Sequence, residues 1–368
     1  MRAAMKAESD KTLTTNQTIW IIAAVAPVGL TTLPREINKN VQQTGWIFIV
    51  IACLIILVAT RALVVLSARY PRQSLIQISD RILGRWLGHC LSLIVIATIL
   101  IGASISVRLI TIGVDTYLLF KTPTSVVILL MLISIWYGIN KGIGTLARFN
   151  ELIQPLLLLI LAIVFLFTMH NYRFSHFLPL ISDKITLKNA IKGGISSFYP
   201  YGFLTILPFL YPNLGHFRQL QRSLLWGIAI IFMMTLSMFI FLIALFGTAE
   251  LDYIESPGID MTRTIEFNML ERMDIIFMVY WIAFAYTTII MTSYAGTIAL
   301  KQYFAKGSFL FWSVTVMVLI FVMSMLPENI EVVRDLASFM NVVAMIILDV
   351  VYPFVLLVDT IRKKVSPS

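Results

Sequence analysis

Long stretches without a single charged residue dominate this sequence. Nine of them contain no Asp, Glu, Lys or Arg, and a tenth, 336–358, contains only Asp349. A helix needs about 20 apolar residues to cross the hydrocarbon core of a bilayer. The nine stretches are 12–34, 40–60, 86–107, 122–140, 152–172, 193–217, 223–249, 275–300 and 307–327. The sequence therefore predicts an all-α integral membrane protein with ten transmembrane helices.

The distribution of basic residues predicts the orientation of these helices. Only 13% of the residues are charged, and the net charge is +9. In a lipid-embedded chain, excess Lys and Arg marks cytoplasmic loops rather than a nucleic-acid surface. If both termini are cytoplasmic, sixteen basic residues lie in inner segments and ten in outer ones, while Arg61 and Arg108 lie within helices. We therefore expect both termini to be cytoplasmic.

Two segments share an unusual pattern of proline and glycine. The segment PVGLTTLP occupies 27–34, in the first stretch, and PYGFLTILP occupies 200–208, in the sixth. Each contains Pro-x-Gly, a threonine and then Leu-Pro. Proline removes a backbone donor and glycine loosens the backbone, so helices 1 and 6 are predicted to be broken near the middle of the membrane. The alternative is a chance match, since Gly and Pro are common in membrane helices.

The positions of the two segments predict an inverted repeat. Each opens a set of five helices, and an odd number of crossings inverts the second set relative to the first, as in secondary transporters. We expect one polytopic domain over 1–368, with a first repeat and N-terminal tail at 1–169, an outer-surface connection at 170–192, and a second repeat at 193–368. Free amides at one half-helix end can hold a carboxylate and carbonyls at the other a cation, which suits a zwitterionic amino acid.

The broken segments supply most of the candidate ligand-binding residues. The aromatic side chains of the second segment either close over an apolar group or ammonium or simply pack. These candidates are Pro27, Gly29, Thr31, Thr32, Tyr199, Tyr201, Gly202 and Phe203.

Polar residues within other stretches add further candidates. Arg108 costs roughly 3 kcal/mol in mid-membrane unless it is paired or hydrated, so it either anchors a ligand or lines the cavity, or it pairs with Asp115. Thr288 and Thr292 share a helix face and supply ligand oxygens or interhelical hydrogen bonds. The same two interpretations apply to Ser104.

Acidic residues in or near the membrane are candidates for gating or an ion-linked role. Asp349 precedes Pro353 in the tenth stretch and either serves such a role or accepts from a freed backbone amide. Glu151, at the entry to the fifth stretch, is the second candidate. No P-loop or HExxH motif occurs, so we expect no enzymatic activity, no cofactor and no metal site.

Three groups of residues form a pattern that spans much of the chain. They are Leu33-Pro34 followed by Gly45-Trp46; Tyr70-Pro71-x-Gln73-Ser74 followed by Leu83-Gly84 and Gly88; and Gly144-x-x-Ala147-Arg148-x-Asn150-Glu151 with Pro155. With these motifs the chain resembles the B subunits of spore germinant receptors, also called endospore germination permeases, within the amino acid/polyamine/organocation transporter superfamily. The likeness covers almost the whole chain.

The resemblance implies a leucine-transporter-like 5+5 inverted repeat in the inner membrane of a dormant spore. It further implies an A subunit and a lipoprotein C subunit as partners, and the sensing of small nutrients such as amino acids to trigger germination. Members of the wider superfamily often carry Gly-Phe-Glu in helix 6, whereas this chain has Gly202-Phe203-Leu204. The missing carboxylate favours a sensor over a pump, and an autonomous amino acid permease is the alternative.

Overall fold

The structure, a computed structural model, is a bundle of helices. It describes residues 13–26, 29–71, 73–119, 121–182, 185–214, 217–265 and 273–365, and no β-strand occurs among them. The predicted all-α class is confirmed. The longer helices are α2 (Thr15–Ala24), α3 (Leu33–Val41), α4 (Gly45–Arg69), α5 (Leu75–Leu83), α6 (Arg85–Tyr117), α7 (Thr124–Ile139), α8 (Ile143–Thr168), α9 (Leu187–Ser197), α11 (Phe217–Leu251), α13 (Met273–Phe304), α14 (Phe309–Met325), α15 (Ile330–Ile346) and α16 (Tyr352–Val365).

Short elements join these helices. They are the 3₁₀ turns η2 (Gln42–Thr44), η3 (Met169–Asn171), η4 (Phe174–Phe177), η5 (Tyr199–Ile206) and η6 (Tyr211–Asn213), the helices α10 (Leu207–Leu210) and α12 (Pro257–Arg263), and the π-helical turn η7 (Ile347–Val351).

Six helical segments in the described part of the chain are long and apolar enough to cross a membrane. They are Leu33–Arg69, Arg85–Tyr117, Ile143–Asn171, Phe217–Leu251, Phe277–Phe304 and Ile330–Lys363, and two shorter apolar helices are Thr124–Ile139 and Phe309–Met325. The outward faces remain apolar: Val58, Leu130 and Leu152 are 72%, 63% and 77% exposed. Exposed apolar side chains on this scale require a lipid environment, so the protein is an integral membrane protein.

Residues 29–32 and 199–206, most of which fall within the two proline- and glycine-containing segments of the sequence, are not α-helical and are called here the two non-α-helical segments. Helix α2 ends at Ala24, and α3 begins only at Leu33. In the second segment, α9 ends at Ser197 and the chain continues as the eight-residue 3₁₀ run η5. Runs of 3₁₀-helix longer than three or four residues are uncommon because their hydrogen bonds are poorer. Both segments therefore leave backbone groups that need partners from elsewhere.

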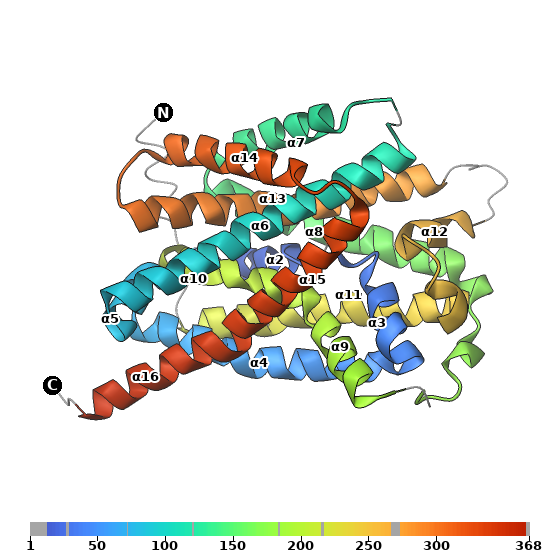
Figure 1. Ribbon diagram of the computed structural model, residues 1–368, viewed down its shortest axis with the longest axis horizontal. Coiled ribbons are helices and arrows are strands. Elements are labelled where there is room, and N and C mark those ends of the chain that lie inside the picture. Colours follow the sequence, from blue (N-terminus) through green and yellow to red (C-terminus); the bar gives the residue numbers. More distant parts are fainter. Residues whose placement is uncertain are drawn as a thin grey trace.

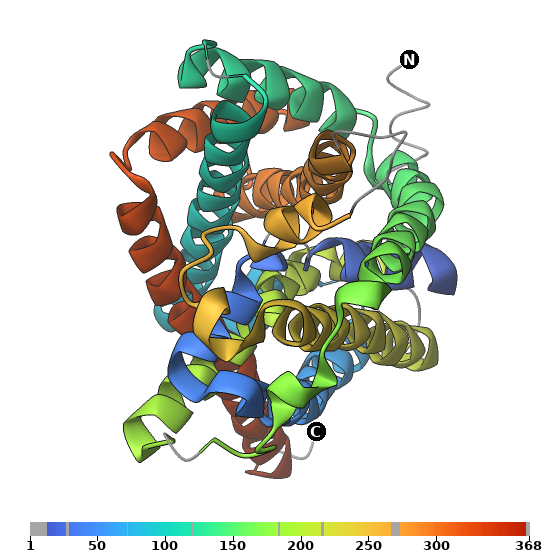
Figure 2. The ribbon, with the colours of Figure 1, turned by 90° about the vertical axis from the view of Figure 1, so that its right-hand side faces the viewer.

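The bundle has two distinct ends. Helices α3, α9 and α12 lie at the right of Figure 1, whereas α5 and the last turns of α16 lie at the left. Figure 2 looks onto the end formed by α3, α9 and α12.

Helix α2 packs against α8, α11 and α13, and Ile21, Ile22, Ala23 and Ala24 are at most 1% exposed. The C-terminal end of α2 is thus enclosed by protein.

A buried ionic cluster joins the end of α4 to α16 and is called here the Asp359 cluster. Arg69 Nη1 donates to Asp359 Oδ2 at 2.6 Å, and the Tyr70 hydroxyl donates to Asp359 Oδ1. Asp359 is 3% exposed. Burial, and then the hydrogen bond with Asp359, raises the pKa of Tyr70 to about 12. The phenol therefore remains a proton donor at neutral pH, and both carboxylate oxygens are satisfied.

We expect Arg69→Ala to lower the free energy of unfolding by about 1–3 kcal/mol, because it removes a charged partner from a buried carboxylate. The matched control is Lys39→Ala, which breaks the exposed pair with Glu36, in which both side chains are over a third exposed. Exposed pairs contribute about 0–1 kcal/mol. Thermal unfolding of the detergent-purified protein measures both changes, and equal effects would show that the Asp359 cluster does not hold α4 to α16.

Candidate ligand-binding cavity

A cavity of about 150 Å³, called here the main cavity, lies beside the two non-α-helical segments. Charged, aromatic and apolar side chains from α3, α6, α12, α13 and α15 surround it. Its lining residues are Gly29, Thr31, Thr32, Leu33, Glu36, Leu109, Ile112, Gly113, Thr116, Tyr117, Ile195, Ser196, Tyr199, Glu255, Ser256, Ile259, Trp281, Ile330, Arg334, Ala337, Ser338 and Asn341.

A smaller space of about 40 Å³, the inner pocket, adjoins the main cavity. Tyr199, Ala337 and Asn341 line both spaces and therefore separate them. The other residues of the inner pocket are Thr98, Gly102, Ile105, Gly202, Phe203, Thr205, Met340 and Ala344. The two spaces together bring six of the sequence candidates to one place: Gly29, Thr31, Thr32, Tyr199, Gly202 and Phe203.

The two non-α-helical segments touch each other at Gly29. A Cβ atom placed on Gly29 would lie 2.0 Å from Cε1 of Tyr199, far inside van der Waals contact. Only glycine allows the Tyr199 ring to approach the backbone this closely. The Gly-x-x-Thr spacing also recurs: Thr32 Oγ1 donates to Gly29 O at 3.4 Å, and Thr205 Oγ1 donates to Gly202 O at 3.0 Å. In both segments a threonine hydroxyl thus donates a hydrogen bond to a backbone carbonyl.

Helix α3 is held at the cavity by contacts with the end of α11, with Asp252 and with the start of α12. Asn38 Nδ2 donates to Thr248 O at 2.8 Å and to Asp252 Oδ1 at 2.6 Å. The amide of Gly258 donates to Thr31 O at 3.3 Å. No side chain caps the N-terminus of α3, which begins at the cavity wall. A helix N-terminus carries a partial positive charge, so this wall favours an anionic group.

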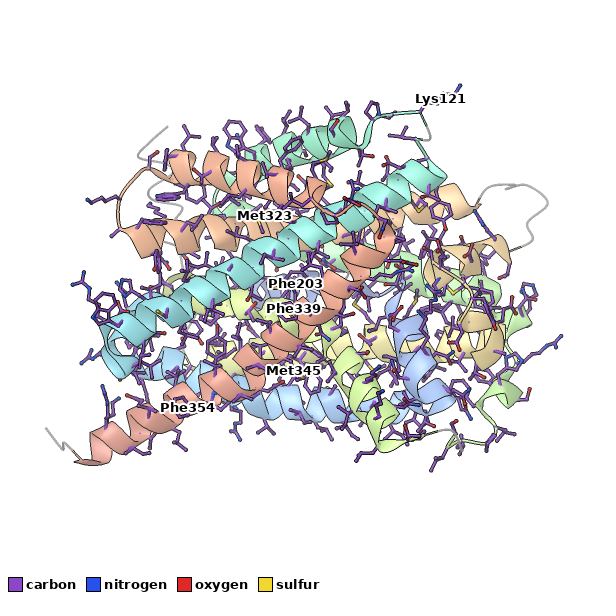
Figure 3. The ribbon with its side chains drawn as sticks, viewed as in Figure 1. Lys121, Phe203, Met323, Phe339, Met345 and Phe354 are labelled. Carbon is purple, nitrogen blue, oxygen red and sulfur yellow. The ribbon has the colours of Figure 1, made fainter. Side chains whose placement is uncertain are left out.

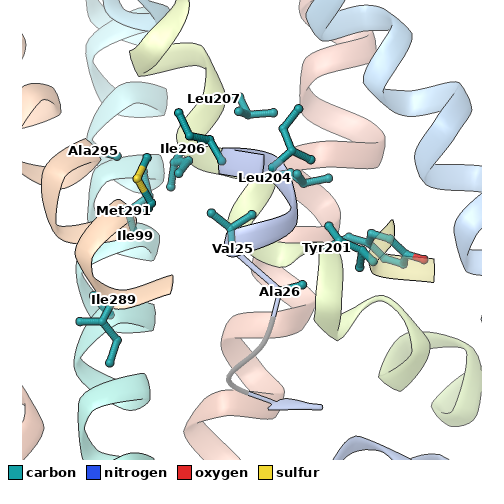
Figure 4. Close-up of a cluster of buried hydrophobic side chains, with 14 of the residues drawn as sticks. Val25, Ala26, Ile99, Tyr201, Leu204, Ile206, Leu207, Ile289, Met291 and Ala295 are labelled. Atoms are coloured by element: carbon teal, nitrogen blue, oxygen red, sulfur yellow. The ribbon is translucent and has the colours of Figure 1, made fainter. Parts of the chain in front are cut away.

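Thr288 joins α13 to the end of α2. Its Oγ1 donates to Ala24 O at 2.7 Å, and Ala24 is the last residue of α2. Thr292 Oγ1 donates instead to Thr288 O and Ile289 O within its own helix. Apolar side chains from the end of α2, from α13 and from η5, among them Val25, Met291 and Leu204, form a buried cluster (Figure 4). Thr288 therefore ties the C-terminal end of α2 to α13.

Two polar candidates of α6 have partners away from the cavity. Ser104 Oγ donates to Leu100 O at 2.8 Å, within the helix itself. Arg108 Nη2 donates to Pro327 O at 2.9 Å, beyond the end of α14, and its buried Nε has no partner among the described residues. Asp115 accepts from Thr124 Oγ1 at 2.7 Å, and no ion pair with Arg108 occurs in the described part of the chain.

The remaining candidates lie apart from the main cavity and the inner pocket. Tyr201 is fully buried in the core. Asp349 lies in the π-turn η7 and lines a different depression, between α4 and α16. Glu151 is half-buried on α8. Pro27 falls outside the described residues.

Sequence reasoning missed several residues of the main cavity, above all Arg334 and Asn341. Arg334 is half-buried and has no hydrogen-bond or ion-pair partner among the described residues. Asn341 is 7% exposed; its Nδ2 donates to Ile195 O at 2.8 Å, and its Oδ1 has no partner in the described part. The two lie seven residues apart and therefore on one helix face. The available sequence signal was the position of Arg334 just before the stretch 336–358, with Asn341 on the same helix face within it.

The cavity offers complementary polar groups to a small ligand. Arg334 and the N-terminus of α3 attract an anion, whereas Glu255 and Asn341 Oδ1 accept hydrogen bonds. Glu36 already pairs with Lys39 at 3.2 Å. Leu109, Ile112 and Trp281 add apolar surface. This combination suits a molecule with both charges and an apolar part.

Comparison with known proteins decides the family. A family model described as "Spore germination protein" matches residues 12–333. The chain belongs to this spore germination family. Spore germination protein YndE of Bacillus subtilis (strain 168) is 26% identical over 98% of this chain and 99% of its own length. Spore germination protein B2 of the same organism is 21% identical over 98% of each chain.

Solved structures with the same fold are transporters. A mutant of the Eremococcus coleocola manganese transporter has a TM-score of 0.60 and 12% identity, over 97% of this chain and 85% of its own. Mhp1, a nucleobase-cation-symport-1 family transporter, has a TM-score of 0.58 and 12% identity, over 92% of this chain and 76% of its own. This member of the spore germination family therefore has a transporter fold.

We expect Thr288→Val to lower stability by about 0.6–1.7 kcal/mol, the range for interhelical hydrogen bonds in membranes. Thr292→Val is the matched control, because its hydroxyl bonds only to its own helix and its loss should change stability much less. Thermal unfolding of the two purified variants measures the difference. Equal destabilisation by the two variants would show that the hydrogen bond from Thr288 to Ala24 O stabilises the protein no more than a bond within one helix.

Proposed function

We propose that this chain is the membrane subunit of a spore germinant receptor that senses a small nutrient, an amino acid, and triggers germination. The observation that carries the proposal is the main cavity, which is lined by residues of both non-α-helical segments in a chain that belongs to a spore germination family. A ligand bound in the main cavity contacts residues from both halves of the chain. A ligand that prefers one arrangement of these halves shifts the protein towards it, to the extent of its differential affinity.

The proposed topology has ten transmembrane helices in a 5+5 inverted repeat, with helices 1 and 6 broken. In this scheme α2 with α3, and α9 with η5 and α10, each form one interrupted crossing. The repeats cover 1–169 and 193–368, joined by an outer-surface connection. Both termini lie in the cytoplasm, and the membrane is the inner membrane of the spore. The excess of basic residues in the inner segments supports this orientation.

The proposed ligand is zwitterionic. Its carboxylate lies near Arg334 and the N-terminus of α3, and its ammonium near Glu255 or Asn341 Oδ1. The cavity of about 150 Å³ suits such a molecule, since an apolar protein cavity of about 150 Å³ holds benzene. Leu109 and Trp281 then contact the apolar side chain. The sequence candidates Gly29, Thr31, Thr32 and Tyr199 form the wall on the side of the interrupted segments.

The proposed partners are an A subunit and a lipoprotein C subunit. Relatives of this chain are described as Spore germination protein A2 of Bacillus subtilis and Spore germination protein GerLB of Bacillus cereus, at 23% and 21% identity. The letters and numbers in the names of these relatives, such as A2 and B2, favour receptors built from several chains. Gating within this subunit is assigned to Asp349 and Glu151. Phe203 contributes to the wall of the inner pocket. Arg108, Ser104 and Tyr201 are assigned a supporting role in holding the helices that surround the cavity.

Arg334→Gln is expected to raise the amino acid concentration needed for half-maximal germination by about tenfold or more, because a hydrogen bond to a charged group contributes about 1.5–3 kcal/mol. Spores carrying the variant are exposed to a panel of L-amino acids, and their loss of optical density is followed. The control is Lys192→Gln, which removes an exposed charge on α9 outside the cavity. An unchanged response at normal protein level would remove Arg334 from the ligand site.

The second candidate function, an autonomous amino acid permease, is favoured by the transporter fold of the neighbours. Proteoliposomes containing only this chain distinguish the two. We expect no uptake of radiolabelled L-amino acids above that of empty vesicles, because sensing needs binding without turnover. Accumulation of label, abolished by Arg334→Gln, would identify a permease instead.

A further inference from the structure

Charged and apolar surfaces are divided between the main cavity and the inner pocket. Three charged side chains line the main cavity, those of Glu36, Glu255 and Arg334. None of the described residues that line the inner pocket is charged. A charged group moved into the inner pocket would lose its hydration without a partner of opposite charge. A zwitterion therefore keeps both charges in the main cavity, and only an uncharged part of it can enter the inner pocket.

The two spaces meet at a neck formed by Tyr199, Ala337 and Asn341, which line both of them. The ring of Tyr199 lies against the backbone of Gly29, which fixes one side of the neck. Ala337, on α15, contributes only a methyl group to the neck. A larger side chain at this position would narrow the connection between the two spaces.

Beyond the neck, the hydrogen-bond donors of the inner pocket are already used. Thr98 Oγ1 and Thr205 Oγ1 each donate to a backbone carbonyl in their own segment, at 2.8 Å and 3.0 Å. The other residues of this wall are glycines and the apolar residues Ile105, Phe203, Met340 and Ala344. A carboxylate or amide end group would thus find no free donor there, whereas an aliphatic group loses nothing on entering.

The size of the inner pocket limits the group that it holds. Its volume is about 40 Å³. One water molecule takes about 30 Å³ in the liquid, and an apolar cavity that holds benzene has about 150 Å³. A Cβ atom on Gly102 would lie 2.8 Å from Cε1 of Phe203 (Figure 3), and one on Gly202 would lie 3.4 Å from Cβ of Ala344. The pocket therefore admits the end of an aliphatic chain but not an aromatic ring.

Helix α15 supplies residues along the whole path from the charges to the inner pocket. Arg334 lines the main cavity, Ala337 the neck, and Met340 and Ala344 the inner pocket. Spacings of three or four residues place them on one side of the helix. The ten residues from Arg334 to Ala344 span about 15 Å at about 1.5 Å each. A ligand that lies along α15 thus meets a charge first and apolar side chains last.

We propose that the inner pocket binds the end of the ligand's aliphatic side chain, and that Ala337, Met340 and Ala344 determine which side-chain lengths the protein accepts. This inference rests on the proposed amino acid ligand, whose charged groups stay in the main cavity. Each methylene group that enters the pocket strengthens binding about fourfold. Once the pocket is full, the next carbon atom meets Met340 or Ala344 and binding weakens. The ligand is therefore an aliphatic amino acid with a limiting side-chain length.

Binding of a linear series of amino acids to the detergent-purified chain tests this inference. The series is glycine, L-alanine, L-2-aminobutyrate, L-norvaline and L-norleucine, in which each member is one carbon atom longer than the one before. A ligand that binds the folded state raises the melting temperature, so apparent dissociation constants follow from titrations. We expect the constant to fall about fourfold per carbon atom up to the limiting length and to rise beyond it.

Variants of the pocket should move the limiting length in opposite directions. Met340→Ala enlarges the pocket and is expected to increase that length by at least one carbon atom, whereas Ala344→Val fills it and should decrease it by at least one. Ala337→Val narrows the neck and should weaken binding of the longer members while glycine binds as before. The control is Met345→Ala, on α15 but not in the pocket lining, which should leave the limiting length unchanged (Figure 3). Each variant is compared only across its own series, so a lower melting temperature without ligand does not affect the comparison.

The outcomes separate this inference from the proposed function. The same limiting length in Met340→Ala and Ala344→Val, as expected of a pocket filled by water, would overturn the inference even if the amino acids germinate the spores. Absence of binding by every member of the series would also overturn it. Binding with both opposite shifts supports the inference, and if none of the bound amino acids germinates spores that carry the chain, the proposed function alone is contradicted.

Discussion

Every backbone amide and carbonyl inside a membrane needs a partner within the protein, because lipid provides none. This requirement governs how the chain can leave the α-helix near its centre. At Gly29 and Gly202 the carbonyls accept from threonine hydroxyls three residues later, and Ala24 O accepts from Thr288. The non-α-helical backbone is therefore stable here because hydrogen bonds from side chains replace the missing hydrogen bonds of the α-helix. The same exposed backbone then forms the wall of a cavity, so one constraint accounts for both features.

The charged residues divide the bundle into two functional ends. At one end Asp359 is fully satisfied by Arg69 and Tyr70. At the main cavity Arg334 and Asn341 Oδ1 lack partners among the described residues. Satisfied buried polar groups rigidify a structure, whereas unsatisfied ones at a cavity are available to a ligand. The contrast supports the proposed assignment of ligand recognition to the main cavity and of structural work to the Asp359 cluster.

Much of this architecture could be predicted from the sequence, because hydropathy alone forces uncharged stretches of about 20 residues to form helices in lipid. The positions of Gly29 and Gly202 beside cavities also followed from the paired Pro-x-Gly pattern. Arg334 and Asn341 did not, since their relevance depends on which face of α15 is turned inwards. Arg108 illustrates the same limit. Its partner is the Pro327 carbonyl, 219 residues away along the chain. Every residue has a backbone carbonyl, so the sequence does not indicate which one is the partner.

The Asp359 cluster has a mechanical consequence for the opposite end. It fixes α16 to α4 at a point about 37 Å from Arg334, taking 25 residues at about 1.5 Å each. If α15 and α16 tilt as one rod about this pivot, a rotation of about 5° carries Arg334 sideways by about 3 Å, roughly the length of one hydrogen bond. Such a rotation is too small to disturb the Asp359 cluster. At Arg334 it is nevertheless large enough to make or break a contact with a bound molecule.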